Sequence, residues 1–364
     1  MLHCGIVGLP LSGKTTVFNV ITKAGAEVKP YAGGRTDPNR AVVEVPDSRF
    51  DLLVLAHNPR KATPAQVEFV DLAGLSKGAG KGAGLGNAFL SFAADADALL
   101  HVIRCFSNGA VEHPEGSVNP LRDWEILDME LIFRDLGIVE NRLGKLSSRK
   151  KLLPEETAER ALLERCRDRL MEERPLRDME LSPEDSRILR GFTFVTAKPQ
   201  IIVLNMDETQ TGIESIPGGA DIERRISESG ACVIKLYGRL EMDLMELSPE
   251  EAAEFTEGIP IGEPGRNRLI AGAYSTLGLI SFFTCGPDEV RAWTLRDGDS
   301  ALDAAGAIHT DLAKGFIRAQ VVSYDDYAAH NNSFATCRDT GVLRLEGRDY
   351  RVRDGDVIEI RFNI

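Results

Sequence analysis

Short apolar runs alternate with helix-compatible stretches in the first third of the chain. The runs are rich in aliphatic and β-branched residues, which is typical of buried strands, and residues 14–23 follow the first run with helical spacing. Strands that alternate with helices form a largely parallel sheet covered by helices. The pattern therefore predicts an α/β domain, with strands at residues 4–8, 67–72, 98–105, 200–204 and 231–236.

A charged segment at about residues 121–192 interrupts this pattern. Its first half carries apolar residues at alternating spacings of four and three, which indicates a helical coiled-coil seam: Ile132, Leu136, Val139, Leu143 and Leu146. Its second half repeats the helical pattern with Leu162, Leu163, Cys166 and Leu170. We predict two antiparallel helices, whose Glu- and Arg-rich faces are either solvated or a charged surface for a partner.

The pattern changes again at residue 279, where short strands separated by turn signals begin. We predict a small, separate α+β domain over residues 279–364, after an α/β domain that occupies residues 1–278. The expected strands of the small domain are residues 281–283, 290–294, 316–322, 342–344 and 357–362.

Composition narrows the function classes for this chain of 364 residues. The formal net charge of −13 argues against a protein that coats nucleic acid by bulk electrostatics, so an RNA partner has to meet a local patch. No apolar run approaches the ~18 residues that a membrane span needs. The first residues lack the features of a secretory signal, so we expect a cytoplasmic protein with no membrane partner. The six cysteines are scattered and fit reduced, mostly buried thiols.

The first apolar run leads directly into a phosphate-binding motif. Residues 8–15 read Gly-Leu-Pro-Leu-Ser-Gly-Lys-Thr and fit the pattern G-x-x-x-x-G-K-[ST] between a strand and a helix. Backbone N–H groups of such a loop surround phosphates, Lys14 bridges the β- and γ-phosphates, and the Thr15 hydroxyl is expected to bind Mg²⁺. The nucleotide-binding residues predicted here are Gly8, Leu11, Ser12, Gly13, Lys14, Thr15 and Thr16.

Asp71 lies at the C-terminal end of the second predicted strand, in the run Asp-Leu-Ala-Gly. Next to the phosphate-binding loop, its carboxylate is expected on the metal side of the site, and the Gly74 N–H is expected to sense the γ-phosphate. Leu75 stands where many GTPases carry the Gln that orients water, so hydrolysis requires another group, the phosphates themselves or a partner.

Residues 205–208 read Asn-Met-Asp-Glu and close a predicted strand, at the point where related folds recognise the base. GTP-specific proteins carry Asn-Lys-x-Asp there. Glu208 is one methylene longer than that Asp, and Met206 replaces the Lys, so we expect guanine selectivity to be lost. Asn205, Met206 and Glu208 are the candidate base-binding residues.

His113 lies in the loop after the third strand. A loop histidine by itself is more often a surface or capping residue than a catalytic one.

Taken together, these motifs resemble the YchF family of Obg-like ATPases. The first part of the resemblance rests on residues 4–10, 68–75, 77–82, 84–87, 101–106 and 205–208. The second rests on residues 289–294, 308–311, 314–319, 324–326, 345–350 and 354–357.

The resemblance implies a P-loop G domain with an inserted helical coiled coil and a C-terminal ubiquitin-like β-grasp module called a TGS domain. It also implies Mg²⁺-dependent hydrolysis of ATP in preference to GTP, and association with the ribosome, chiefly its large subunit. The family's proposed catalytic histidine matches His113, which would act with Lys14.

Three short segments depart from the family pattern. Leu11-Ser12 replaces the usual Asn-Val of the loop, and Arg35 replaces the Thr that would bind Mg²⁺. Thr36 could take over that role, Arg35 could contact phosphate directly, or the triphosphate could be sensed weakly. Tyr237 follows the last base-side strand, where it could stack on a base or block it.

The sequence leaves three functions open. The leading one is an Mg²⁺-dependent ATPase. The second is a nucleotide-responsive, ribosome-binding switch with little or no turnover, and the third is a GTPase of the same fold.

Overall fold

The computed structural model describes residues 2–22, 27–29, 38–71, 87–109, 111–255 and 263–363. It divides into two compact units. The first unit comprises Met1–Val42 and Glu68–Leu269, and the second comprises Val43–Val67 and Ile270–Ile364.

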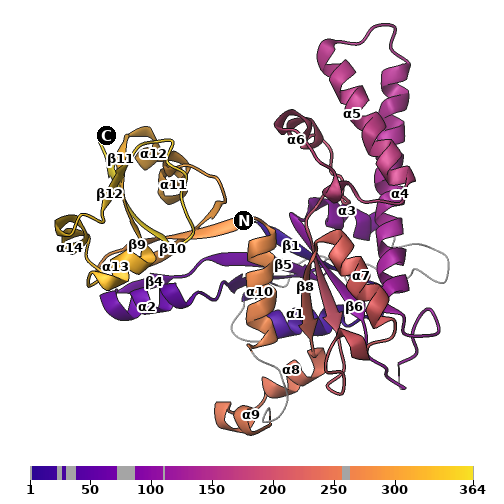
Figure 1. Ribbon diagram of the computed structural model, residues 1–364, viewed down its shortest axis with the longest axis horizontal. Helices are drawn as coiled ribbons and strands as arrows, with labels where there is room; N and C mark the ends of the chain where they lie inside the picture. Colours follow the sequence, from indigo (N-terminus) through magenta and orange to yellow (C-terminus); the bar gives the residue numbers. More distant parts are fainter. Residues whose placement is uncertain are drawn as a thin grey trace. The chain divides into compact units, whose positions relative to one another are not determined.

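The first unit is built on a seven-stranded sheet with the order β2-β3-β5-β1-β6-β7-β8 (Figure 1). Strand β1 pairs in parallel with β5 and β6, β6 with β7, and β7 with β8, whereas β2 and β3 are antiparallel. The strands are β1 (His3–Val7), β2 (Glu27–Lys29), β3 (Asn39–Glu44), β5 (Gln66–Asp71), β6 (Ala98–Arg104), β7 (Gln200–Asn205) and β8 (Cys232–Leu236).

The central strands are apolar because helices cover both faces of a parallel sheet. Every residue of β6 and β7 is buried, and four of the five residues of β1 are buried. The five α/β strands predicted from the sequence are confirmed within one or two residues at each end.

The remaining elements of this part of the chain are helical. They are α1 (Lys14–Thr22), α3 (Asn87–Asp95), α4 (Pro120–Ser147), α5 (Pro154–Met171), η2 (Leu176–Asp178), α6 (Pro183–Leu189), η3 (Ile213–Ser215), α7 (Gly219–Ser229), α8 (Gly238–Leu244), α9 (Pro249–Phe255) and the start of α10 (Gly265–Thr276), whose residues from Ile270 onward belong to the second unit.

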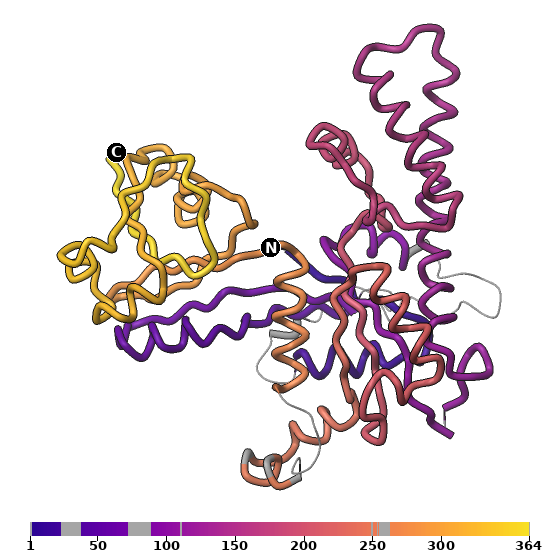
Figure 2. The backbone as a smooth tube through the Cα atoms, in the orientation of Figure 1, coloured from indigo at the N-terminus to yellow at the C-terminus, as the bar shows by residue number. Residues whose placement is uncertain are grey.

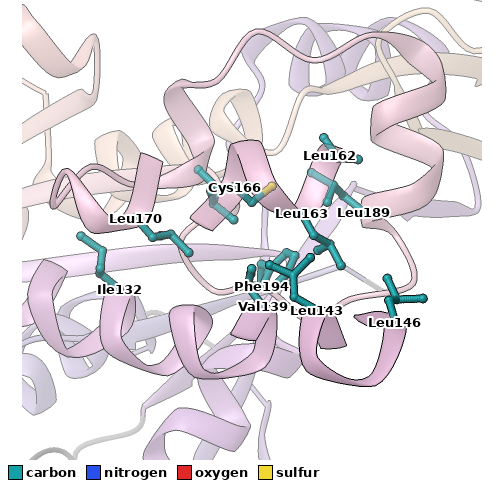
Figure 3. Close-up of a cluster of buried hydrophobic side chains, with 11 residues drawn as sticks. Ile132, Val139, Leu143, Leu146, Leu162, Leu163, Cys166, Leu170, Leu189 and Phe194 are labelled. Carbon is teal, nitrogen blue, oxygen red and sulfur yellow. The ribbon is translucent and has the colours of Figure 1, made fainter. Parts of the chain in front are cut away.

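Helices α4 and α5 form the predicted antiparallel hairpin, and Figure 3 shows its apolar side chains pointing toward one another. Pro120 occupies the first turn of α4, where its missing N–H breaks no helical bond, and Asn119 caps the helix by accepting from the Arg122 N–H. The seam residues inferred from the spacing lie in one cluster: Ile132, Val139, Leu143, Leu146, Leu162, Leu163, Cys166 and Leu170 are buried, and Leu136 is partly buried.

A buried carboxylate holds the base of this hairpin. Asp135, on α4, accepts hydrogen bonds from the Val195 N–H at 3.1 Å and from the Thr196 N–H and hydroxyl, both at 2.7 Å. These bonds tie the hairpin to the segment that leads back into β7. Burial nevertheless raises the pKa of Asp135, because desolvation of the charged form outweighs the hydrogen bonds.

The second unit contains a six-stranded sheet with the order β12-β11-β13-β9-β10-β4. Strand β13 lies parallel to β9, β9 and β10 form an antiparallel hairpin, and β11 pairs antiparallel with β12. The order of the five C-terminal strands is that of a β-grasp fold, which confirms the predicted class. They are β9 (Leu279–Cys285), β10 (Glu289–Arg296), β11 (Phe316–Ser323), β12 (Arg344–Glu346) and β13 (Asp356–Phe362).

The helices of the second unit cap and cover this sheet. Helix α11 contributes Ala301, Ala304 and Ala305 to a core shared with β9, β11 and β13. The helices are α2 (Ser48–His57), α11 (Ala301–Ile308), α12 (Thr310–Lys314), α13 (Tyr324–Ala329) and α14 (Phe334–Asp339).

One predicted strand lies two residues further on than expected. The sequence predicts residues 342–344, whereas β12 covers Arg344–Glu346. The N–H groups of Val342 and Leu343 both donate to the Cys337 carbonyl, so they end helix α14 and are unavailable to a strand ladder.

A segment from the first quarter of the chain belongs to the second unit. Strand β4 (Lys61–Thr63) pairs in parallel with β10, and Figure 2 follows this segment alongside the C-terminal strands. The structural division therefore differs from the predicted boundary at 278/279, because it places Val43–Val67 with the C-terminal strands.

Candidate functional site

The phosphate-binding loop connects β1 to α1 through three residues with positive φ: Gly8 at 150°, Leu11 at 63° and Gly13 at 96°. Glycine is required at two of them for space as well. A Cβ on Gly8 would lie 2.4 Å from the Val102 carbonyl oxygen, and one on Gly13 would lie 2.2 Å from Asn205 Nδ2. The loop thus adopts the tight turn that brings successive N–H groups to the start of a helix.

Lys14, the first residue of α1, folds back over this loop. Its side chain is buried, and Nζ donates to the carbonyl oxygens of Gly8 at 3.0 Å and Leu9 at 2.8 Å. Burial lowers the pKa of Lys14 to about 8, and the nearby Asp71 carboxylate partly opposes that shift. A phosphate chain at the loop would supply the negative charge that this desolvated ammonium favours.

The hydroxyl of Thr15 donates to Asp71 Oδ2 at 3.2 Å. Asp71 is the last residue of β5 and lies opposite Ile6 of β1, so the sheet register places its carboxylate beside the loop. One hydroxyl and one carboxylate are the protein ligands expected where Mg²⁺ keeps waters and phosphate oxygens in its coordination shell. Over the described ranges, no group of three or more His, Cys, Asp or Glu side chains could hold a metal ion, so a metal cage made by those side chains alone is not formed there.

An open pocket of about 900 Å³ adjoins the loop. Five predicted nucleotide-binding residues line it: Gly13, Thr16, Asn205, Met206 and Glu208. Its other walls are Phe106, Ser107, Asn108, Gly109, Asp207, Arg239, Met242 and Asp243. The structure therefore joins the loop after β1 to the loop after β7 at one edge of the sheet, as expected where parallel strands end together.

Asn205 links the two halves of this pocket. Its Nδ2 donates to the Ser12 carbonyl at 3.0 Å, and its Oδ1 accepts the Gly238 N–H at 3.2 Å. Because the side chain is buried and both ends of its amide are engaged, Asn205 positions the loops that surround the pocket.

The residues after Asn205 divide between the core and the pocket. Met206 is buried in an apolar cluster, and its N–H donates to the Leu236 carbonyl at 2.7 Å. Asp207 Oδ1 accepts from the N–H and hydroxyl of Thr209, whereas the Glu208 side chain is exposed at the pocket.

Tyr237 and Arg239 resolve a question that the sequence left open. Tyr237 is buried in the apolar cluster and its hydroxyl donates to the Gln210 carbonyl at 2.8 Å, so it is absent from the described pocket lining. Arg239, with a side chain 86% exposed, lines the pocket instead. The tyrosine lies behind the loop, and the arginine faces the pocket.

Sequence reasoning missed two walls of the pocket. Residues 106–109 follow β6, which lies between β1 and β7, and Met242 and Asp243 lie on the helix that follows Tyr237. The strand order was the missing signal, because it decides which loops meet at one edge.

The sequence similarity between the chain and its relatives extends over its full length. The chain is 41% identical over 362 residues to the "Ribosome-binding ATPase YchF" of Escherichia coli O157:H7, and the match covers 99% of each chain. The protein of the same name from Bacillus subtilis is 41% identical over 368 residues and is matched along 100% of both chains. The chain belongs to the YchF family.

Family models and a solved structure agree with this membership. A model described as "50S ribosome-binding GTPase" matches residues 3–134, and the model of the C-terminal YchF region, described as a protein of unknown function, matches residues 279–363. The YchF GTPase of Schizosaccharomyces pombe superposes with a TM-score of 0.87 at 36% identity, over 99% of this chain and 97% of that one. The P-loop domain followed by a YchF C-terminal domain is thus the fold of the chain.

No helix within the part of the chain that the structure describes has the length and apolar character of a membrane span.

His113, which matches the proposed catalytic histidine of the YchF family, lies outside the described lining of the pocket. Its Nδ1 accepts the Glu115 N–H at 3.1 Å, so its proton is on Nε2, which lies 2.8 Å from Asp123 Oδ2. Both side chains are 4% exposed. In this conformation both ring nitrogens are engaged, and a catalytic role would require the ring to leave Asp123.

The two loop residues that depart from the YchF pattern differ in their surroundings. Leu11 has a positive φ, and its side chain is exposed. Ser12 is buried, and its Oγ has no hydrogen-bond partner among the described residues. A buried hydroxyl in this loop is a donor that a phosphate oxygen could satisfy.

Several predicted positions lie outside the described residues. They are Gly74, Leu75, Arg35 and Thr36.

Proposed function

We propose that this YchF-family chain is a cytoplasmic, Mg²⁺-dependent ATPase that associates with the ribosome. One arrangement carries the proposal: the buried Lys14 ammonium and the Thr15–Asp71 pair stand together at the phosphate-binding loop. Lysine, hydroxyl and carboxylate serve a triphosphate and its metal in P-loop hydrolases.

In this proposal the protein mainly positions the triphosphate. The N–H groups of the loop and the start of α1 bind the β-phosphate, and Lys14 leaves its two carbonyl partners to bridge the β- and γ-phosphates. The Thr15 hydroxyl and the Asp71 carboxylate would hold the metal ion. Bound Mg²⁺ would neutralise charge that develops on the phosphate oxygens.

We propose that ATP is preferred over GTP. The base pocket lacks a lysine at position 206, and the flexible Glu208 replaces the shorter Asp that pairs with guanine. Arg239 supplies an exposed guanidinium that can lie over either purine, so it adds affinity without selecting guanine.

The large ribosomal subunit is the partner we propose. The curated relatives are named ribosome-binding, and the matching G-domain model is described as 50S ribosome-binding. We also assign the C-terminal β-grasp region at residues 279–364 as a TGS domain and residues 1–278, with the coiled coil at about 121–192, as the G domain.

A direct test combines turnover with co-sedimentation. The purified chain should hydrolyse ATP only with Mg²⁺, and it should sediment with isolated large subunits more than with small subunits. Lys14→Ala should abolish turnover, whereas Lys314→Ala, which changes an exposed lysine, should not. Equal sedimentation with both subunits contradicts the partner assignment, and Mg²⁺-independent hydrolysis contradicts the enzyme assignment.

The described geometry favours one alternative, a ribosome-binding switch with little turnover. His113 is buried against Asp123 and both its nitrogens are engaged, so the only proposed proton-transfer group is held away from a water nucleophile. Nucleotide-dependent sedimentation without ATP hydrolysis would favour this alternative. A third candidate, a GTPase, follows from the S. pombe relative, which is named a YchF GTPase, and it requires tighter binding of GTP than of ATP.

A further inference from the structure

Two arginines share one buried carboxylate in the first unit. Arg177 Nη2 donates to Asp128 Oδ1 at 2.9 Å, and Arg225 Nη2 donates to Asp128 Oδ2 at 3.2 Å. The carboxylate lies on α4, whereas the arginines come from η2 and α7. Trp124 lies one helical turn before Asp128 on α4 and packs against Arg225. We call Trp124, Asp128, Arg177 and Arg225 the two-arginine cluster.

The cluster is well enclosed. The Asp128 side chain is 7% exposed, that of Arg177 13% and that of Arg225 27%. The Arg225 guanidinium lies 5.4 Å from the centroid of the Trp124 ring, and Trp124 is fully buried. The four side chains therefore form one continuous contact group, in which Arg225 is the most exposed member.

Three N–H groups of this cluster have no hydrogen-bond partner among the described residues: Trp124 Nε1, Arg177 Nη1 and Arg225 Nε. Buried donors are nearly always paired in folded proteins. The single carboxylate already accepts one bond on each oxygen from the two guanidinium groups, so it does not satisfy the remaining donors.

The charges of the cluster do not balance either. Two guanidinium groups face one carboxylate, which leaves an excess of one positive charge. His101 packs edge-on to Trp124, but it adds neither a cation nor an anion, because burial lowers the pKa of His101 to about 4. Gln200, which donates to His101 Nδ1 at 3.1 Å, is uncharged as well.

We propose that the two-arginine cluster binds one small inorganic anion, which accepts hydrogen bonds from Trp124, Arg177 and Arg225. An anion meets both requirements, since it balances the excess charge and accepts hydrogen bonds from the unpaired donors. The site is separate from the nucleotide pocket, whose described lining contains none of these side chains. Halide ions and tetrahedral phosphate both carry negative charge and accept hydrogen bonds.

An anion bound there would hold α4, η2 and α7 together. The coiled-coil hairpin begins with α4 and returns through η2, so occupancy would fix the base of the hairpin against α7. Binding is expected to stabilise the folded protein, because an anion that binds only the native state raises its free energy of unfolding.

Trp124 supplies a direct probe. The chain has two tryptophans, so Trp293→Phe leaves Trp124 as the only indole. Sodium bromide and sodium phosphate are titrated separately into that variant, with acetate used to hold the ionic strength constant. We expect saturable quenching by bromide if the site takes halides, or a saturable spectral shift with phosphate alone if it takes tetrahedral anions. A linear bromide response without saturation, together with no phosphate response, overturns the proposal.

Substitutions distinguish an anion site from a purely structural cluster. Arg177→Met, in the Trp293→Phe background, should weaken anion affinity by about tenfold or more, because a charge-assisted bond is lost. Asp128→Asn removes the competing negative charge with little change of shape, so it should tighten anion binding even if it lowers stability. Arg165→Met, at a side chain 51% exposed on α5, is the matched control and should leave affinity unchanged.

The proposal predicts weaker anion binding for Arg177→Met and tighter anion binding for Asp128→Asn. A general loss of structure would not change the affinity in opposite directions. Near-UV circular dichroism checks that each variant is folded, and Arg225→Gln replaces Arg177→Met if the latter is not. Unchanged affinity in both the arginine and the aspartate variants contradicts the proposal.

Discussion

The Thr15 hydroxyl donates a hydrogen bond to Oδ2 of Asp71 over 3.2 Å, across 56 residues of sequence. The contact exists because β5 lies beside β1 in parallel, so that the end of one strand meets the helix that follows the other. If the pair holds a metal, Thr15→Val should reduce the affinity for a non-hydrolysable ATP analogue by about tenfold or more when Mg²⁺ is present.

The control for this substitution lies on the same helix. Thr22→Val removes a hydroxyl whose bond is to the Asn19 carbonyl, and it should leave affinity unchanged. Isothermal titration calorimetry with and without Mg²⁺ measures both variants. An equal loss with and without Mg²⁺ for Thr15→Val contradicts a metal role.

The Lys14 pKa of about 8 predicts a pH dependence of nucleotide binding. Below that value the free protein carries the ammonium that phosphate needs. Above a pH of about 8 the Lys14 side chain of the free protein is neutral and must take up a proton when the nucleotide binds. Nucleotide affinity should therefore fall by up to about tenfold per pH unit.

Calorimetry in buffers of different ionisation enthalpy should detect this proton uptake above pH 8. Titration of the nucleotide phosphates is complete in that range, because their last pKa lies near 6. Affinity that stays constant between pH 8 and pH 10, without proton uptake, contradicts the Lys14 assignment.

Leu11 occupies a backbone conformation that disfavours its side chain. Its φ is 63°, and the side chain is 53% exposed, so little packing offsets the strain. Asn adopts this region several-fold more readily, so Leu11→Asn should raise the free energy of unfolding by about 0.5–1 kcal/mol. Leu247→Asn changes an exposed leucine without positive φ and should give no gain in urea denaturation.

The buried His113–Asp123 bond separates a catalytic from a structural role. If His113 assists hydrolysis after leaving Asp123, His113→Ala should lower turnover, whereas Asp123→Asn, which holds the ring less strongly, should keep it. If the bond is only structural, both variants should lower stability by about 1–3 kcal/mol and leave turnover of the folded protein unchanged. Steady-state ATPase assays and urea denaturation distinguish these outcomes.

Arg239 is predicted to contact the base and not the phosphates. Arg239→Ala should weaken ATP-analogue binding by about two- to fivefold, the size of an exposed cation–π contact, and leave binding of inorganic tripolyphosphate unchanged. Arg224→Ala, which removes an exposed arginine paired within α7, is the control. Equal weakening of both ligands by Arg239→Ala would instead place the arginine at the phosphates.

Local sequence patterns predicted the coiled-coil seam and the phosphate-binding loop, because interactions between residues close in sequence determine both. The seam from Ile132 to Leu170 follows from helical spacing, and the loop before Lys14 follows from glycines with restricted space. The direction of Tyr237 was not predictable, because a tyrosine next to a glycine can turn either way until the core behind it is known. Only the apolar cluster and the Gln210 carbonyl decide that it turns inward.

Features made by distant segments could not be predicted either. The pairing of β4 with β10 joins residues more than two hundred positions apart, and no local spacing signals it. The same holds for Asp128 with Arg177 and Arg225, whose three segments meet only through the packing of α4, η2 and α7.

The most direct test of the central claim is calorimetric titration of the unmodified chain with non-hydrolysable ATP and GTP analogues, each with and without Mg²⁺. The proposed ATPase predicts that the ATP analogue binds more tightly than the GTP analogue and that Mg²⁺ strengthens both. Tighter binding of the GTP analogue, or affinities that do not respond to Mg²⁺, would contradict the account.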